Sequence, residues 1–495
     1  MMIKMKKKGS TGCSTTTTMM IGMTAFAVSV LLYLIHRLST GFLFNINDSI
    51  SSPSALSKLT EKYQGIFKSE LIKEKTHDDH DLMNIIEKQP TYEEHQPKPK
   101  PNQFIIINCD TSHDRYDLCI LNSTTTLDPT NSTFYVDNDS SSVITTPPNK
   151  TIHKIRPYPR KWENFTMARI KELTIVTTST KIDCQIQHQA PALVFSAGGY
   201  TGNLFHDFND GFIPLFVTIR SAFPNGIAPI LVVSHCREWW LKKYAELLRQ
   251  FSPYPIINLD NDSKTHCFPS TTTVGLISHG YMTINPTLLP NSDSFLDFRK
   301  LVGSAYDTKT SHYNQQAPSR PRLVLTSRTG RSRVILNQAE VILLAKEVGF
   351  EVSVFEPNEH TSLKQAYKLI NSSHVMVGVH RAALTHSLFL RPKSILIQVV
   401  PVGIDWLAET CFGKSAKDMG LEYMECRINV NESSLVDKYG KDHLVLKDPK
   451  AVMKDNLSHT KDIYLNDQNV NVDLVRFRRY LTSAYKKAKI FMDEL

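Results

Sequence analysis

The chain has 495 residues, of which 41% are hydrophobic and 21% are charged, and its formal net charge is +9. This length predicts about two or three domains, and the ordinary globular composition allows each of them a buried core. The positive charge is modest, and four of its lysines lie within the first eight residues. The sequence therefore gives no basis for a nucleic-acid-binding function, and we expect no nucleic acid partner.

An uncharged apolar segment, Met19–Ile35, follows this lysine cluster. It is at the short end of the roughly 17–25 residues that span a bilayer. Because positively charged flanks stay cytosolic, residues 1–18 would form a cytosolic tail and the long remainder would be luminal. A cleaved signal peptide is the alternative, but Tyr33–Leu38 fits a small-x-small cleavage site poorly. We therefore predict a single transmembrane signal anchor over 19–35.

Asn-x-Ser/Thr acceptor triplets support a luminal body. One of them, Asn47, lies shortly after the anchor. The predicted glycosylation sites in the body are Asn122, Asn131, Asn138, Asn149, Asn164, Asn261, Asn371, Asn431 and Asn456. Because such triplets also arise by chance in chains rich in Asn and Ser, we expect only some of them to be used.

Seven of the eight cysteines lie beyond the anchor, where an oxidising lumen would allow disulfides. The pairs predicted from nearness in the sequence are Cys109–Cys119, Cys411–Cys426 and Cys236–Cys267. Cys184 would then remain as a buried thiol. The cysteines lack the CxxC spacing of zinc sites, and the DxD-like triplet Asp260–Asp262 also reads as a routine turn. We expect no metal site.

Residues 36–102 are polar, carry mixed charge and end in a Pro-Lys run, so they predict an extended luminal stem. The folded body begins near Gln103. Its first half contains the expected strands Phe104–Asn108, Glu172–Thr178, Pro191–Ala197 and Ala228–Ser234, and the expected helix Arg237–Phe251. The segment 122–151 is rich in Ser, Thr and Asn and predicts an exposed, sugar-decorated loop or hairpin.

From about Arg320 onward, strand and helix patterns alternate at short intervals. The expected strands are Pro321–Arg328, Glu351–Pro357, His374–His380 and Ser394–Pro401, and the expected helices are Asn337–Val348, Thr361–Ile370, Ala382–Leu390 and Leu474–Ile490. Such alternation indicates βαβ units and a parallel sheet. We predict an α/β fold with two doubly wound, Rossmann-like domains, 103–310 and 311–495. They would face a cleft at the carboxyl ends of their strands, where such sheets bind ligands.

A glycine-rich turn, Gly198–Gly202, follows one of the expected strands. A helix that begins at the end of this turn would put Asn203, His206 and Asp210 on one face. A histidine with a carboxylate one turn away is a candidate general base, because the carboxylate fixes the tautomer and stabilises the cation. Asp207 is an alternative base. The same residues would also suit simple capping of a strand–turn–helix.

Three arginines, Arg328, Arg331 and Arg333, follow the expected strand Pro321–Arg328. Arginine is always charged and can bind phosphate through two parallel hydrogen bonds, so we interpret them as a phosphate site. Glu340 in the next helix is a candidate ion-pair partner. Solvated loop arginines remain the alternative.

A third motif, Gly378–His386, links an expected strand to an expected helix. The free N–H groups at such a helix start attract an anion such as a diphosphate. The small side chain of Ala382 would allow close approach. We predict that Gly378, His380, Arg381 and Thr385 also contribute, although an ordinary strand-to-helix turn would have the same pattern.

Several long stretches occur in one order along the body. They are RPYPRKWE (156–163), GGYTGNLFHDFNDGFIPLF (198–216), HCFPS (266–270), RPRLVLTSR (320–328), FEPNEHTSL (355–363), INSSHVMVGVHRAALTHSLFLRP (370–392) and AETCFG (408–413). Together they resemble the plant branch of glycosyltransferase family 61, which holds xylan arabinosyltransferases and xylosyltransferases. The resemblance spans nearly the whole body, from about Cys109 to Lys489.

The resemblance implies a GT-B-like fold, inverting sugar transfer and a single-pass type II Golgi membrane protein. Residues 103–310 would form the acceptor-side domain, and 311–495 the nucleotide-sugar domain with a returning C-terminal helix. The implied partners are a UDP-pentose donor, a xylan or xylo-oligosaccharide acceptor, the membrane and a Golgi hetero-complex. The residues expected to bind substrate are Asn203, Arg328, Arg333, Gly378, His380, Arg381, Ala382, Thr385 and Glu409. With arginines and a helix start at the diphosphate, a divalent metal should not be required.

One position departs from the family pattern Gly-Val-His-Gly-Ala, because Arg381 replaces its second glycine. Arginine does not easily adopt the positive φ angles open to glycine, so the substitution brings donor binding into question. It keeps open a non-catalytic glycan-binding or scaffold protein of the Golgi. Sugar transfer to glycoproteins, as in other branches of the family, is a second alternative.

Overall fold

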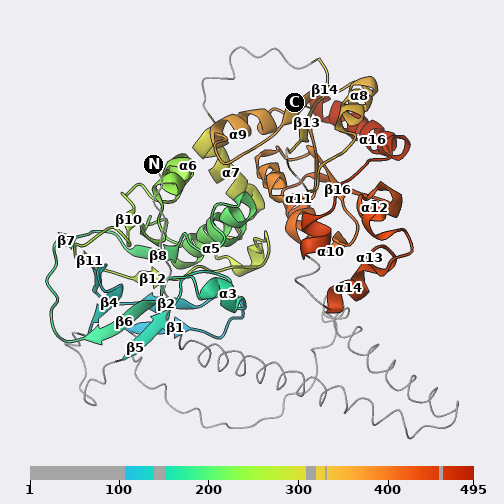
Figure 1. Cartoon of the computed structure of the whole chain (residues 1–495). Coiled ribbons are helices and arrows are strands. Elements are labelled where there is room, and N and C mark those ends of the chain that lie inside the picture. Colours follow the sequence, from blue (N-terminus) through green and yellow to red (C-terminus); the bar gives the residue numbers. More distant parts are fainter. Residues whose placement is uncertain are drawn as a thin grey trace, which may run out of the picture. The chain divides into compact units, whose positions relative to one another are not determined.

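The computed structural model describes residues 106–138, 151–307, 319–328, 330, 332–455 and 461–494 (Figure 1). The chain divides into two units, Met1–Pro99 and Lys100–Leu495, and every described residue belongs to the second. The predicted cytosolic tail, signal anchor and stem lie outside the described residues. Within the described ranges, no helix has the length and apolar character needed to cross a membrane.

The first half of the second unit contains a mixed six-stranded sheet. Its strands, in spatial order, are β1 (Ile107–Asp110), β2 (Leu118–Leu121), β12 (Thr272–Val274), β8 (Ala192–Ser196), β9 (Ile230–Ser234) and β10 (Ile257–Asn258). From β12 to β10 the strands run parallel, whereas β2 is antiparallel to both of its neighbours. β8 and β9 are buried throughout, as their unbroken apolar sequences predict for parallel strands.

A second six-stranded sheet belongs to the same half, and we did not expect it. Its strands, in spatial order, are β5 (Ile152–Ile155), β6 (Leu173–Thr178), β4 (Thr133–Asp137), β3 (Thr125–Asp128), β11 (His266–Phe268) and β7 (Ile186–Gln187). Only the pairs β4–β6 and β11–β7 are parallel. The prediction of a plain Rossmann-like first half was therefore wrong. The β3–β4 pair within 122–151 confirms the hairpin predicted there as one alternative, but the segment is not simply exposed, because Leu127 and Phe134 are fully buried.

Alternate residues of β8 face two different cores. Val194 belongs to the apolar core that the two sheets share. Leu193 and Phe195 instead pack with α5 (Ile213–Ala222) and α6 (Glu238–Phe251). The first sheet is thus covered by a sheet on one face and by helices on the other.

The second half contains a five-stranded sheet in which every pair is parallel. Its strands, in spatial order, are β14 (Glu351–Phe355), β13 (Arg322–Thr326), β15 (Val375–Val379), β16 (Ile395–Val400) and β17 (Glu422–Arg427). Counted along the chain this order is 2-1-3-4-5, so the direction of winding reverses between β13 and β15. The predicted parallel sheet of alternating βα units is confirmed here, and ligands of such sheets bind at the reversal point.

Helices cover both faces of this sheet. α8 (Gln338–Val348) and α16 (Leu474–Asp493) pack on one face, and α9 (Leu363–Asn371) and η5 (Ala382–Phe389) on the other. The expected α-helix over Ala382–Leu390 is a 3-10 helix. α7 (Phe295–Tyr306) shares the core of α6 and α9, so one apolar core continues from the first half into the second.

The remaining helical segments are short. They are α3 (Asn164–Met167), α4 (Leu204–His206), η2 (Asp207–Phe212), η3 (Pro286–Leu288), α10 (Asp405–Ala408), η6 (Glu409–Gly413), α11 (Lys414–Asp418), η7 (Val430–Glu432), α12 (Leu435–Tyr439), α13 (Leu444–Lys447), α14 (Pro449–Asp455) and η8 (Lys461–Asn466). Two of them, α4 and η2, form the start of the candidate site described below.

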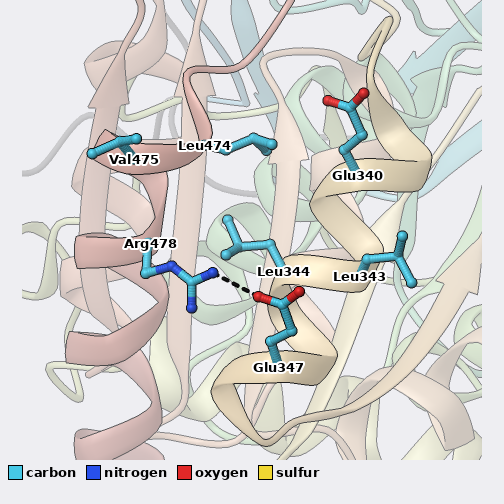
Figure 2. A pocket seen from close by; sticks show the side chains of 7 residues that line it. All are labelled: Glu340, Leu343, Leu344, Glu347, Leu474, Val475 and Arg478. Atoms are coloured by element: carbon cyan, nitrogen blue, oxygen red, sulfur yellow. Dashed lines mark hydrogen bonds and ion pairs between the residues drawn. The ribbon is translucent and has the colours of Figure 1, made fainter.

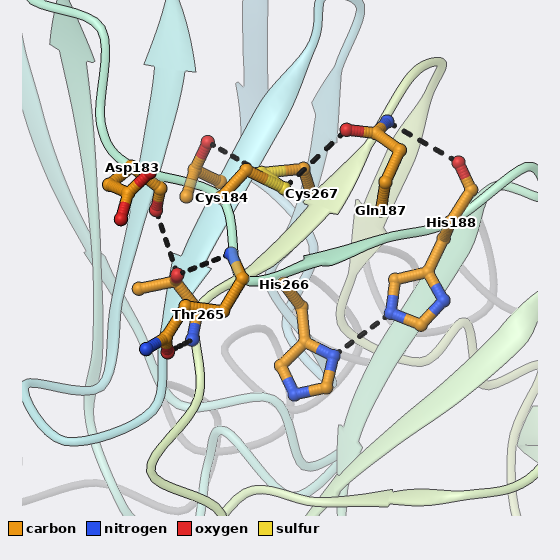
Figure 3. The surroundings of a disulfide bond; sticks show 9 residues. Asp183, Cys184, Gln187, His188, Thr265, His266 and Cys267 are labelled. Atoms are coloured by element: carbon orange, nitrogen blue, oxygen red, sulfur yellow. Dashed lines mark hydrogen bonds between the residues drawn. A yellow bond between two sulfur atoms is a disulfide. The ribbon is translucent and has the colours of Figure 1, made fainter.

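The cysteines pair differently from most of our predictions. The pair Cys109–Cys119 is confirmed, because β1 and β2 place the two residues opposite each other. The second disulfide joins Cys184 to Cys267, since β7 and β11 bring these distant segments together (Figure 3). The predicted pairs Cys236–Cys267 and Cys411–Cys426 were wrong, as was a free Cys184. Cys411 and Cys426 belong to separate cores and, like Cys236, are buried free thiols.

The predicted glycosylation sites differ in exposure. Asn131, Asn164, Asn261 and Asn431 are exposed, and Asn122 and Asn138 are half-buried. Asn371 is also half-buried, and its side-chain oxygen accepts a hydrogen bond from Arg299 at 2.7 Å. Asn149 and Asn456 lie outside the described residues. Glycosylation of these sites stays a prediction.

Candidate active site

The turn after β8 requires glycine at two positions, because the backbone has a positive φ at both and packs against Tyr158 at one of them. Gly199 has a φ of +62°, and an added Cβ would lie 2.5 Å from the ring of Tyr158. Gly202 has a φ of +109°. Asn203 then caps α4, accepting a hydrogen bond from the backbone N–H of Phe205 at 3.1 Å. Asn203 is exposed and acts as a helix cap, as the simpler interpretation of this motif expected.

His206 and Asp210 come together at the start of η2, which is a π-helix. His206 Nδ1 lies 2.8 Å from Asp210 Oδ2. The side chain of His206 is 20% exposed, whereas that of Asp210 is 3% exposed. A π-helical turn within an α-helix is frequent at functional sites. The expected closeness of these two side chains is confirmed.

Asp210 is held as an anion by a buried arginine that the site prediction did not include. Arg160 Nε donates to Asp210 Oδ2 at 2.8 Å, and the hydroxyl of Tyr158 donates to the same oxygen at 3.0 Å. Burial alone would raise the pKa of Asp210. The hydrogen bond from His206 and the charge of Arg160 outweigh burial, so this pKa lies below its ordinary value of 3.8.

An ionised Asp210 orients the proton of His206. We assign that proton to Nδ1, where Asp210 accepts it, so Nε2 carries a lone pair. Among the described residues, His206 Nε2 forms no hydrogen bond. The NH2 group of Arg160, which is also a donor, lies 3.1 Å from Nδ1 and could bond it only if Nδ1 carried no proton. The shorter contact of Nδ1 with the ionised Asp210, at 2.8 Å, favours the protonated Nδ1. The arrangement leaves one partly exposed imidazole nitrogen that can accept a proton from a substrate hydroxyl.

Asp207 has a different environment and is only 2% exposed. Its Oδ1 accepts from the backbone N–H of Gly202 at 3.0 Å, and its Oδ2 accepts from the hydroxyl of Tyr244 at 2.6 Å. Burial raises its pKa. Because both oxygens have partners within the protein, Asp207 ties the glycine turn to α6, and the geometry favours His206 as the base.

Arg160 and Tyr158 lie in the stretch RPYPRKWE, to which we had assigned no chemical role. A sequence signal existed, because Arg160 lies in one of the long stretches shared with the family. Only the fold, however, shows that Arg160 lies against Asp210 and is 4% exposed. The two residues are 50 positions apart.

A cluster of arginines lies at the carboxyl ends of β13 and β15, where the winding of the sheet reverses. Arg328 follows β13 and is exposed, whereas Arg381 follows β15 and is 6% exposed. Arg381 donates from its NH2 group to the backbone oxygen of Ser327. Arg333 donates from NH1 to the backbone oxygen of His380 at 3.2 Å. The predicted contributor Arg331 lies outside the described residues.

The charges of these arginines are only weakly compensated by the described residues. Burial, together with the charges of Arg328 and Arg333, lowers the pKa of Arg381 to about 10, although Glu356 acts in the opposite direction. Burial and the charge of Arg328 lower the pKa of Arg333 to about 10 as well. In the part of the chain that the structure describes, none of the three forms an ion pair with a carboxylate. The buried Nε atoms of Arg333 and Arg381 have no hydrogen-bond partner, so the cluster is suited to bind an anion.

Arg381 adopts a backbone conformation that is open to any residue, with a φ of −174°. The concern that arginine would be strained at a glycine position is therefore unfounded. Gly378 is needed for another reason, because an added Cβ would lie 1.9 Å from Thr326 Oγ1 on the neighbouring strand. Gly378 thus serves the packing of β15 on β13.

His380 is buried beside this cluster. Burial and the charge of Arg333 lower its pKa to about 3, and Gln398 Nε2 lies 2.7 Å from its Nδ1. His380 is therefore neutral, adds no further positive charge to the cluster, and accepts the hydrogen bond from Arg333 through its backbone oxygen. Of the two predicted residues on η5, Ala382 is half-buried, and Thr385 is buried with no hydrogen-bond partner for its hydroxyl.

Aromatic rings connect the two parts of the site. Phe205 lies edge-on to His206, with ring centroids 5.3 Å apart, and also to Phe412 at 5.6 Å. Phe412 in turn lies 5.4 Å from His380. α4 also contacts η5 directly. His206 and the arginine cluster therefore approach each other across two phenylalanines.

Comparison with known proteins agrees with this arrangement. The model of the family Glycosyltransferase 61 matches residues 204–397. A xylan glycosyltransferase of Arabidopsis thaliana is 40% identical over 403 residues, which cover 77% of this chain and 80% of that protein. The chain belongs to glycosyltransferase family 61.

Other relatives of this family 61 glycosyltransferase carry related names. An alpha-1,3-arabinosyltransferase of Oryza sativa subsp. japonica is 36% identical, and the match covers 75% of this chain and 64% of that protein. A beta-1,2-xylosyltransferase of the same plant is 37% identical, with 68% of this chain and 72% of that protein covered. The range matched by the family model includes both His206 and the arginine cluster.

Glu409 was expected to bind substrate in the family 61 enzyme, and this stays a prediction, because its side chain is about half exposed. Glu409 Oε1 pairs with Lys417 at 2.8 Å, and its other oxygen lies where a Cβ on Gly413 would be. The carboxylates of the DxD-like triplet also have separate partners. Asp260 pairs with Lys171 at 2.9 Å, and Asp262 pairs with His266 at 3.0 Å.

A surface pocket of about 300 Å³ lies away from these residues, between α8 and α16 (Figure 2). Its lining residues are Glu340, Leu343, Leu344, Glu347, Leu474, Val475 and Arg478. Glu340 thus lies at this pocket, and Arg478 pairs with Glu347 there at 2.6 Å. None of the predicted substrate-binding residues of the glycosyltransferase lines it.

Proposed function

We propose that this glycosyltransferase moves a pentose, arabinosyl or xylosyl, from a UDP-sugar to the xylan backbone with inversion at the anomeric carbon. The observation that carries the proposal is the meeting of two groups across Phe205 and Phe412. Among the described residues, one is a histidine whose Nε2 forms no hydrogen bond, and the other is an arginine cluster that forms no ion pair with a carboxylate. The names of the relatives, which include xylan glycosyltransferase, support the choice of acceptor.

On the donor side, Arg328, Arg333 and Arg381 would bind the diphosphate beyond the ends of β13 and β15. Their charges stabilise the negative charge that develops as the diphosphate leaves. We include in the proposal that no divalent metal is required, since these arginines can supply the necessary positive charge. The two halves of the unit would then act in a GT-B-like manner, one for each substrate.

On the acceptor side, His206 Nε2 removes the proton from the attacking hydroxyl. The hydroxyl oxygen forms a bond to the anomeric carbon while the bond from that carbon to the diphosphate oxygen breaks, and UDP leaves. Asp210 stabilises the imidazolium that results, and Arg160 positions Asp210. A single displacement of this kind inverts the configuration.

The proposal includes a single-pass type II protein of the Golgi membrane with its body in the lumen. The disulfides Cys109–Cys119 and Cys184–Cys267 support an oxidising compartment. The exposed Asn-x-Ser/Thr sites agree with it. A Golgi hetero-complex remains a further expectation. The alternative of an inactive scaffold is not favoured, because Arg381 is unstrained and its cluster forms no ion pair with a carboxylate within the described ranges.

The full-length protein should be incubated with xylohexaose and, separately, UDP-arabinose, UDP-xylose and UDP-N-acetylglucosamine. We expect a mass increase of one pentose with one of the first two donors, and linkage analysis should place it on a backbone xylose. Transfer from UDP-N-acetylglucosamine alone, or UDP binding without transfer from any donor, would contradict the proposal.

A further inference from the structure

Beside His206, aromatic rings surround the guanidinium of Arg160. Its central carbon lies 5.1 Å from the ring centroid of Tyr200, 5.6 Å from that of Trp162 and 5.7 Å from that of Tyr281. The ring of Tyr200 stacks on His206 with centroids 4.5 Å apart. This group of aromatic rings therefore extends from a direct contact with the candidate base His206.

The arrangement continues outward through two further arginines. Arg115 lies 5.0 Å from the ring centroid of Trp162 and 5.1 Å from that of Tyr281. Arg169 lies 5.7 Å from the ring of Tyr200 and 4.8 Å from that of Phe165. We call the four rings Trp162, Phe165, Tyr200 and Tyr281 the aromatic platform.

Two rings of the aromatic platform are unusually open to solvent, since Trp162 is 41% exposed and Phe165 is 76% exposed. A single exposed apolar side chain needs no explanation. Trp162 and Phe165 differ from such a single side chain, because they lie three positions apart and adjoin the rings that contact the candidate base. Such a grouping is typical of a binding surface, because it leaves apolar area in water unless a ligand covers it.

The segments that carry Trp162 and Tyr281 are tied to neighbouring elements before any ligand binds. The backbone N–H of Lys161 donates to the backbone oxygen of Arg115 at 3.0 Å, and Lys161 Nζ pairs with Asp117 at 2.8 Å. Next to Tyr281, the backbone N–H of Met282 donates to Asn209 on η2 at 2.7 Å. Since these segments are already ordered, little conformational entropy is lost on binding.

The chemistry of these side chains matches a neutral sugar chain. A pyranose ring has a flat C–H face that packs on an aromatic ring, and its equatorial hydroxyls accept hydrogen bonds from arginine. We propose that the aromatic platform binds an extended chain of β-linked pyranoses, with the unit to be modified near Tyr200 and more distant units on Trp162 and Phe165. The inference rests on the proposed function and identifies where its acceptor lies.

Another occupant is conceivable on this surface, because Asn164 is exposed directly beside Phe165 and begins a glycosylation triplet. A glycan on Asn164 would lie near the aromatic platform. The variant Asn164→Gln separates this case from binding of a free acceptor.

The test measures kcat/KM of the full-length enzyme for xylobiose and for xylohexaose. We expect Trp162→Ala and Phe165→Ala each to lower the value for xylohexaose by about 3–10-fold, mainly through KM, because each loses one ring contact. In Phe165→Ala, whose ring lies on Arg169 rather than Arg160, the value for xylobiose and the KM of the donor should stay the same within about twofold. Trp162→Phe should recover most of the loss. Tyr254→Ala is the matched control, since this ring is 42% exposed but lies after α6, away from the platform.

A second readout, quenching of tryptophan fluorescence by xylohexaose without donor, separates this inference from the proposed function. If the wild type transfers pentose but both alanine variants keep its preference for the longer acceptor, the inference is wrong and the function stands. If no transfer occurs but xylohexaose binds in a manner that Phe165→Ala weakens, the function is wrong and the platform stands. Binding that appears only in Asn164→Gln would overturn the platform as an acceptor site.

Discussion

At the scale of single residues, Arg381 combines burial with a charge that no carboxylate in the described structure pairs. Its pKa is lowered to about 10, first by burial and then by Arg328 and Arg333. Its extended backbone shows that the side chain, rather than the main chain, distinguishes it from glycine. A buried charge of this kind costs stability and becomes favourable only when an anion arrives.

We predict that Arg381→Met stabilises the nucleotide-free protein but weakens nucleotide binding. Replacing the unpaired cation should raise the melting temperature by about 2–4 °C. The Kd for UDP should rise about 10–100-fold, because a charge-assisted hydrogen bond is lost. Calorimetry and thermal melting measure both effects. Arg478→Met is the control, since Arg478 pairs with Glu347 on the surface and should change neither quantity much. A lower melting temperature with unchanged UDP affinity would contradict the prediction.

Asp210 should make the stability of the body depend on pH. Its pKa in the folded protein is below 3.8, so the unfolded chain binds this proton more readily. Its contribution is therefore complete at pH 6 and is lost as the pH falls from about 4 through the lowered folded pKa.

We predict that Asp210→Asn lowers the free energy of unfolding by about 2–3 kcal/mol at pH 6, since it removes the charged acceptor of Arg160, Tyr158 and His206 and leaves Arg160 paired only with Glu163. The difference from wild type should shrink at pH 3. Urea unfolding at both pH values tests this. Asp442→Asn, at an exposed pair with Lys447, serves as the control and should have little effect. An equal difference at both pH values would show that Asp210 is not ionised in the folded protein.

At the scale of elements, the second half was predictable because β15 is an apolar run, β16 is apolar apart from Gln398, and a helical pattern separates them. The second sheet of the first half was not. β3 is short and rich in Thr, and its partner β11 lies far along the chain, so no local pattern indicates the pairing. The β-strand propensity of a residue describes only its local preference, whereas the pairing of β3 with β11 depends on tertiary packing.

The sequence predicted which residues of the glycine-rich segment lie together, but not which of them acts as the base. Helical spacing correctly brought His206 to Asp210. It gave no means of ranking His206 above Asp207, because that distinction depends on Tyr244, which bonds Asp207 from α6, and on Arg160, which bonds Asp210. Both partners are distant in the sequence.

The pairing of β7 with β11 sets a testable disulfide pattern. Peptide mapping without reduction should recover Cys109–Cys119 and Cys184–Cys267, with Cys236, Cys411 and Cys426 as free thiols. We predict that replacing both Cys184 and Cys267 by alanine lowers the free energy of unfolding by about 2–4 kcal/mol, because this bond closes a long loop.

The matched control for this pair is the double variant Cys411→Ala and Cys426→Ala, which removes two thiols that do not bond to each other. It should lose stability only through the small volume removed from two separate cores. Recovery of a Cys411–Cys426 peptide would contradict the structure.

At the scale of the whole molecule, one continuous apolar core runs from the helices on the first sheet to one face of the second-half sheet. This core holds His206 on one side of Phe205 and Phe412, with the arginine cluster on the other. The catalytic proposal depends on that relation, since a base and an anion site act on one substrate pair only when they lie close together.

The most direct test of the central claim compares His206→Ala with Asp207→Asn in the pentose-transfer assay, with UDP affinity measured in parallel. We predict that His206→Ala lowers kcat by about 10²–10⁴-fold while the Kd for UDP is unchanged. Asp207→Asn should keep kcat within about tenfold of wild type. Wild-type kcat in His206→Ala, together with a large loss in Asp207→Asn, would contradict the account.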